Sequence, residues 1–120
     1  MTKIDNIKIP VRYTVGGQDM EVEIVSPDSP IGDQLGLCKI SSGKVYIASN
    51  QTETSMQNTF IHELIHTILD TVGRPELSND ESLVCSVAGV VLEALRSMEF
   101  DDNDKDNKGN KEKEGEMINE

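Results

Sequence analysis

The sequence predicts an α+β fold in which a small antiparallel sheet of two hairpins packs on two helices. Apolar and polar side chains alternate through much of the first 48 residues, as in strands that bury one face. Between residue 52 and about residue 98, apolar side chains instead recur every three or four positions, as in helices. Because the strands come first and the helices follow, we expect an antiparallel sheet covered by helices rather than alternating βαβ units.

The first hairpin is predicted between residues 7 and 25. Its first strand alternates apolar and polar positions from Ile7 to Val15, and its second strand does so from Met20 to Ile24. Gly16 and Gly17 lie between them and favour a tight turn. Pro10 has no N–H to donate to a neighbouring strand, which favours an edge position for the first strand.

The second hairpin is predicted from two short runs, Leu35–Ile40 and Lys44–Ala48. Ser41-Ser42-Gly43 separates them and is typical of a turn. We expect the Lys44–Ala48 strand to lie at an exposed edge, where an extended peptide could pair with it.

The first helix is predicted from Thr52 to about Val72, a stretch without glycine or proline. Asn50 and Glu53 are spaced as a capping box at its start, and Gly73 ends it. After a loop from residue 73 to residue 79, the second helix is expected from about Asp80 to Met98.

Length and charge indicate one small acidic domain. We expect residues 1–100 to form it and residues 101–120, which contain only two apolar side chains, to be a disordered charged tail. The formal net charge of −11 argues against nucleic-acid binding through phosphate contacts and against adsorption to anionic membranes. No apolar run has the length of a membrane span or a signal-peptide core, so we expect a cytoplasmic protein.

The chain has two histidines, and they form the motif His62-Glu63-Leu64-Ile65-His66. On a helix, residues i and i+4 lie on one face, so both imidazoles can bind one metal ion. The glutamate between them can reach a water on that metal and act as general base. The H-E-x-x-H spacing therefore predicts a Zn²⁺ site with His62 and His66 as ligands and Glu63 as the catalytic residue.

A catalytic zinc site needs a third protein ligand, and no third histidine exists. Glu81 lies on the same line of the second helix as the apolar residues that follow it, so it is the first candidate. The alternative is that Ser78-Asn79-Asp80-Glu81 forms a capping box, with Glu81 bonded back to the Ser78 amide. Asp80 and Glu76 are further candidates for the ligand.

Four other residues have two interpretations each. Asp70, one turn after His66, either orients that imidazole or is an exposed residue near the helix end. Tyr46 either stabilises an oxyanion or is an ordinary strand aromatic. Cys38 and Cys85 lie in different elements, and we interpret both as reduced, buried, apolar thiols rather than as nucleophiles or a disulfide.

These motifs resemble those of gluzincin-type metallopeptidases, most closely the very short ImmA/IrrE-like forms of phages and prophages. The resemblance covers about residues 35–95: the hairpin with Gly36-Leu37-Cys38, the helix with H-E-L-I-H, and a helix opening with acidic residues. It implies that His62, His66 and Glu81 are zinc ligands, that Glu63 is the general base, and that the substrate is a protein or peptide.

A second function is compatible with the same zinc site. A zinc-stabilised phage-type protein would bind a host partner without cleaving it. The small domain and the lack of an obvious Tyr or His oxyanion donor favour this alternative. A third possibility is a metal-free domain in which the motif is coincidental, and it predicts no loss of stability on adding a chelator.

Overall fold

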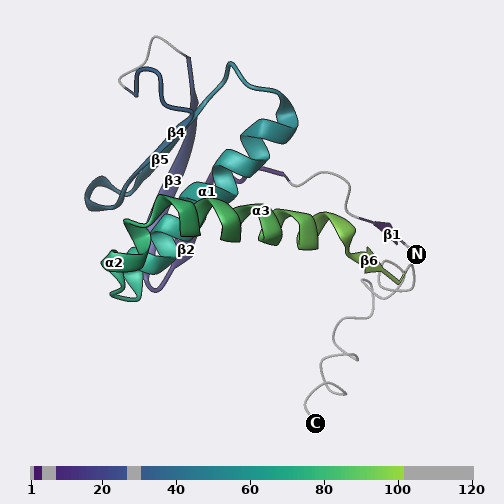
Figure 1. The fold of residues 1–120 in the computed structure, drawn as a ribbon. Helices are drawn as coiled ribbons and strands as arrows, with labels where there is room; N and C mark the ends of the chain where they lie inside the picture. The colour runs from purple at the N-terminus through teal and green to yellow at the C-terminus, as the bar shows by residue number, and fades with distance from the viewer. Residues whose placement is uncertain (1, 4–7, 27–30, 102–120) are drawn as a thin grey trace, which may run out of the picture.

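A computed structural model gives the fold of this chain and describes residues 2–3, 8–26 and 31–101. It is an α+β fold with one four-stranded sheet and three helices (Figure 1). No helix in these residues is both long and apolar enough to span a membrane. The predicted tail lies almost wholly outside the described residues, as does the beginning of the first predicted strand.

Two hairpins build the sheet, as predicted. Strands β2 (Arg12–Val15) and β3 (Gln18–Val25) are antiparallel, and so are β4 (Gly36–Lys39) and β5 (Lys44–Ala48). A short 3-10 turn, η1 (Ile40–Ser42), joins β4 to β5. The left-handed backbone of Gly43, with φ of 66°, closes that turn and accounts for glycine there.

The prediction of an antiparallel sheet is wrong, because the two hairpins join in parallel. The strand order is β2-β3-β5-β4, with β3 and β5 parallel. Burial explains this placement: Val45 and Ile47 of β5 are 0% exposed, so β5 suits the interior of the sheet, whereas the shorter β4 is at one edge. The expectation that Lys44–Ala48 is an exposed edge is therefore also wrong. Strand β2 is the other edge, in agreement with Pro10 just before it.

In the described part of the chain three helices follow the sheet: α1 (Glu53–Thr71), α2 (Pro75–Ser78) and α3 (Glu81–Ser97). The two long helices match the prediction to within two residues at each end, and α2 lies in the predicted loop. After α3, the short strand β6 (Glu99–Phe100) pairs with β1 (Thr2–Lys3) near the N-terminus (Figure 1).

Neither predicted capping box forms. Thr52, rather than Asn50, caps α1, because its side chain accepts a hydrogen bond from the Ser55 amide at 3.1 Å. Asp80 caps α3, and its carboxylate accepts from the Leu83 amide at 3.1 Å. The Ser78 side chain is thereby free for a different contact, and Glu81 becomes the first residue of α3.

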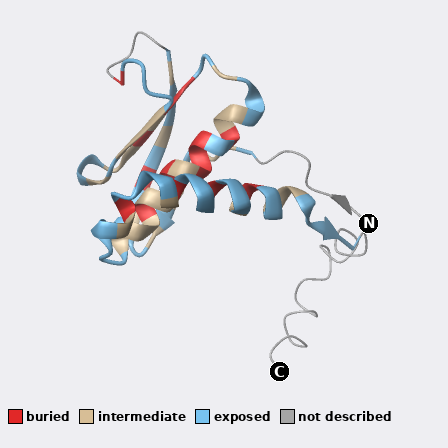
Figure 2. Cartoon of the chain, in the orientation of Figure 1, coloured by how far each residue is buried: buried red, intermediate tan, exposed pale blue. Residues whose placement is uncertain are grey.

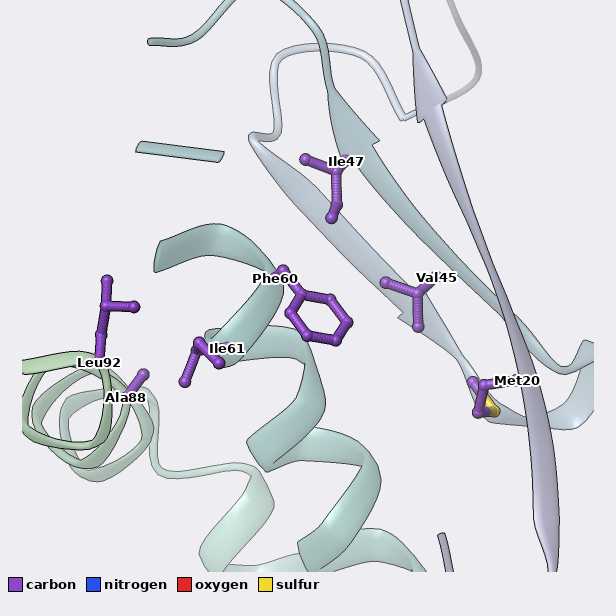
Figure 3. Close-up of a cluster of buried hydrophobic side chains, with 7 residues drawn as sticks. All are labelled: Met20, Val45, Ile47, Phe60, Ile61, Ala88 and Leu92. Carbon is purple, nitrogen blue, oxygen red and sulfur yellow. The ribbon is translucent and has the colours of Figure 1, made fainter. Parts of the chain in front are cut away.

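Helix α1 lies between the sheet and α3 (Figures 1 and 2). Its side chains that face the sheet and those that face α3 are both buried. Phe60 points toward Val45 of the sheet, whereas Ile61 points toward Ala88 and Leu92 of α3 (Figure 3). Burying one large apolar side chain of this kind stabilises the folded state by about 1.5–3 kcal/mol. The packing therefore fixes the rotation of α1, and with it the direction of every other side chain on that helix.

Candidate metal centre

The two histidines of α1 lie where α1 meets α3. They are one helical turn apart, their ring centroids are 4.9 Å apart, and their side chains are only 19% and 15% exposed for His62 and His66 respectively. Because Ile61 packs against α3, the next residue along the helix is carried to the rim of that interface. The H-E-x-x-H segment is thus helical, with both imidazoles on one face.

Glu81, the first residue of α3, lies between the two imidazoles. Its Oε1 is 3.1 Å from Nε2 of His62, and its Oε2 is 3.1 Å from Nε2 of His66. The structure therefore brings together the three residues predicted as zinc ligands. Although Glu81 lies on the apolar line of α3, its side chain is 66% exposed, so it sits at the rim of the interface and not in the core.

The two alternative ligands are engaged elsewhere. Asp80 caps α3, as described above. Glu76 lies on α2 and pairs with Arg74, whose Nε is 2.6 Å from the carboxylate. The Arg74 guanidinium also holds the pKa of Glu76 below its usual value.

Ser78 contacts His66 at Nδ1, the ring nitrogen that does not face Glu81. Its hydroxyl oxygen is 2.9 Å from Nδ1 of His66, and the residue is buried at the end of α2. A hydroxyl can either donate or accept, so it suits an imidazole in either tautomer, including one whose Nε2 is given to a metal. Asp70, the predicted candidate for this role, is exposed and lines the adjoining cleft.

Cys85 is exposed and lies beside the site, so the expectation that it is a buried apolar thiol is wrong. Its Sγ is 3.8 Å from Nδ1 of His62. Ligand atoms of His62, Glu81 and Cys85 all lie within 4.8 Å of one another. Cys38, in contrast, is half-buried, and its thiol lies 3.4 Å from the Thr67 hydroxyl.

Glu63 is the buried carboxylate of the site, and only 6% of the residue is exposed. Burial raises its pKa to about 7, and the nearby charge of Glu81 adds to the effect. Gly36 of β4 passes directly over it: a Cβ at that glycine would lie 3.1 Å from Glu63 Oε2 and 2.5 Å from Thr59 Cγ2. The absence of a side chain at Gly36 therefore lets the edge strand approach the carboxylate.

The surroundings of His62 favour its neutral form. Burial lowers its pKa below the usual value, although the Glu81 carboxylate opposes that effect. A neutral imidazole is the form that binds a metal, because the nitrogen lone pair must be free.

A cleft of about 680 Å³ opens over these residues. Residues 34–38, which lead into and include most of the edge strand β4, form one wall. The end of α2, the first turns of α3 and the His62–His66 face of α1 form the other. Its neutral polar side chains include Asn58 and Asn79. Tyr46 is absent from this lining, because strand alternation places it on the face of the sheet opposite Val45 and Ile47. The oxyanion interpretation of Tyr46 is therefore wrong.

The donors present fit zinc by their chemistry. Two imidazoles and one carboxylate are a common ligand set for catalytic zinc, and the three side chains already converge from two helices. Sequence reasoning missed Ser78 and Cys85. The four-residue spacing of Glu81 and Cys85 was a usable signal, since it places both on one helical face. No family model, curated protein or solved structure matches this chain.

Proposed function

We propose that this chain is a zinc-dependent metallopeptidase of the gluzincin type, with a minimal zincin-like domain resembling the ImmA/IrrE-like proteins of phages. One observation carries the proposal. The Nε2 atoms of His62 and His66 both lie 3.1 Å from the Glu81 carboxylate, and the motif glutamate is buried beside them. These are the three ligands and the base that hydrolysis at a zinc centre requires.

Zinc, when bound, supplies a Lewis acid that polarises a carbonyl oxygen and acidifies water. The protein supplies proton transfer and orientation. In the metal-free protein burial raises the pKa of Glu63 to about 7, and its carboxylate lies in the cleft beside the ligands, where it can take a proton as a general base and return it as a general acid. Ser78 positions the His66 ring through Nδ1. Asn58 and Asn79 offer amide N–H donors to a carbonyl oxygen in the cleft.

Substrate binding is assigned to the β4 edge rather than to β5. Strand β4 is an outer strand of the four-stranded sheet, and its residues line the cleft beside Glu63. An extended peptide paired with this edge would pass directly over the metal ligands. Both cysteines are free thiols, consistent with action in the reducing cytoplasm, including that of a host cell.

Glu63→Gln tests the proposal. The variant keeps all three ligands, so it should bind zinc like the wild type while losing cleavage of a peptide library analysed by mass spectrometry. Glu93→Gln, at an exposed position on the far part of α3, is the matched control and should cleave normally. Cleavage that persists in Glu63→Gln would remove the assignment of Glu63 as base.

The alternative is a zinc-stabilised protein that binds a partner without cleaving it. The nearness of Cys85 to His62 favours it, because a fourth protein donor is the mark of a structural zinc site. It predicts zinc binding with no cleavage in either the wild type or Glu63→Gln, and a partner that binds both equally.

A further inference from the structure

Asp70 lines the cleft but has no role in the proposed function. It lies four residues after His66 on α1, so both side chains project from the same face of the helix. The side chain is exposed, and no hydrogen bond or ion pair engages its carboxylate among the residues that the structure describes. Arg74, the next basic residue along the chain, pairs with Glu76 instead. The Asp70 carboxylate is therefore available to a ligand in the cleft.

The helix itself does not account for an acidic residue at this position. Asp70 is the second-last residue of α1, where the helix dipole places partial negative charge. A carboxylate is disfavoured there, whereas a basic side chain would be favoured, and the last turn of α1 has no basic residue. Asp70 therefore does not stabilise the helix that carries it.

The cleft is acidic along the part of the chain that the structure describes. Besides the two histidines, its ionisable lining residues include Glu63, Asp70 and Glu81, and none of the lining residues is a lysine or an arginine. Glu63 also shows that this space is built for a ligand. It is 6% exposed, and its carboxylate has no hydrogen bond within the described ranges. A buried carboxylate without a partner is costly, and a bound ligand would offset that cost.

Strand β4 can hold an extended ligand along the cleft. The Ala48 amide of β5 donates to the Leu35 carbonyl at 2.9 Å, and antiparallel pairing alternates from residue to residue. The backbone N–H and C=O groups of Gly36 and Cys38 therefore point away from β5, toward the open edge of the sheet. An extended peptide can form hydrogen bonds with them.

The contacts of β4 set the direction of such a peptide. Gly36 lies beside Glu63 and Cys38 beside Thr67, so β4 runs in the same direction as α1. Burial raises the pKa of the Cys38 thiol and the charge of Asp70 adds to the effect, which places Asp70 near the Cys38 end. A peptide antiparallel to β4 thus has its N-terminal part beside Asp70.

The distance along α1 limits which residue of the peptide can reach Asp70. Asp70 is six positions beyond Leu64, the centre of the metal motif, and this corresponds to about 9 Å along the helix. An extended chain covers that length in about three residues. We propose that Asp70 selects peptides that carry a lysine or an arginine up to about three residues before the scissile bond. This inference rests on the proposed function and deepens it.

Cleavage of a randomised peptide library, read by mass spectrometry at low salt, tests the selection. The zinc-loaded wild type should prefer lysine or arginine over glutamine at one of these positions by about two- to fivefold, the range of an exposed ion pair. Asp70→Asn should abolish the preference, and Asp70→Lys should reverse it in favour of acidic residues. Glu93→Gln and Glu93→Lys make the same changes of charge outside the cleft and should leave the preference unchanged. Urea unfolding should show Asp70→Asn to be at least as stable as the wild type.

A binding measurement needs no cleavage. Two fluorescent peptides of alanine and threonine, identical except for one lysine or one glutamate, are titrated with zinc-loaded Glu63→Gln. Fluorescence anisotropy should show tighter binding of the lysine peptide, and adding Asp70→Asn should remove the difference.

The outcomes separate this inference from the proposed function. Wild-type cleavage without a basic preference, or a preference that Asp70→Asn retains, overturns the inference and leaves the proposed function in place. Equal binding of the two peptides also overturns it. A wild type that cleaves no peptide, but whose cleft binds the lysine peptide more tightly through Asp70, supports the selection and contradicts the proposed cleavage.

Discussion

Glu63 should make the stability of the metal-free protein fall as the pH rises, and Glu63→Gln should remove that fall. The folded-state pKa of Glu63 is about 7, against 4.5 for an unperturbed glutamate. The folded protein thus favours the protonated side chain. The stability that this preference contributes is fully present below about pH 4.5 and is lost as the pH rises through about 7.

The magnitude follows from the two pKa values. They differ by about 2.5, and each pKa unit corresponds to about 1.4 kcal/mol, which gives about 3–4 kcal/mol for a residue that is only 6% exposed. Glutamine has nearly the shape of the protonated acid and does not ionise. Relative to the wild type, Glu63→Gln should therefore gain about 3 kcal/mol between about pH 4 and about pH 8.

Urea unfolding in the presence of a chelator, at several pH values in this range, measures the difference. Glu93→Gln, at an exposed position, is the control and should follow the wild type at every pH. If the free energies of unfolding of Glu63→Gln and the wild type run parallel from about pH 4 to about pH 8, Glu63 does not occupy the buried environment described above. Glu63 would then lack the raised pKa that suits it to act as the base.

Three further predictions concern the metal and its surroundings. Zinc at a hundredfold excess over its dissociation constant should stabilise the wild type by about 2.7 kcal/mol in thermal or urea unfolding, and His66→Ala should abolish the effect; equal stabilisation of both would mean that zinc binds elsewhere. Gly36→Ala should destabilise by about 1–3 kcal/mol, because its Cβ would meet Thr59, whereas Gly89→Ala, with open space around it, should be neutral or stabilising. Adding Thr59→Ser, which removes the clashing methyl, should restore much of the loss; no restoration would contradict the contact. Ser78→Ala should weaken zinc binding about ten- to hundredfold in a competition titration, while Ser86→Ala, at an exposed position on α3, should not change it; identical affinities would remove the role of Ser78.

The elements and part of the site could be predicted because their signals are local. Helix α1 follows from the recurrence of Phe60, Ile61 and Leu64, and both histidines then share one face by geometry alone. The position of Glu81 at the start of α3 follows from the apolar line through Val84 and Ala88. Both hairpins follow from alternation and turn residues.

What the sequence did not predict depends on contacts between distant segments. The parallel pairing of β3 with β5 depends on how the two hairpins meet, and alternation within each hairpin does not specify it. The contact between Ser78 and His66 requires α2 to fold back against α1. Asp80, and not Ser78, caps α3. Both residues are of types that cap helices, so the sequence alone does not decide between them.

Zinc binding by four variants tests the central claim most directly. The wild type should bind one zinc ion per chain in metal analysis of purified protein, and His62→Ala and Glu81→Ala should each lose it. Asp80→Ala and Glu76→Ala should retain zinc, since the Asp80 carboxylate caps α3 and the Glu76 carboxylate pairs with Arg74. Full zinc affinity in Glu81→Ala would contradict the account, because it would mean that the carboxylate lying between the two histidines is not a ligand.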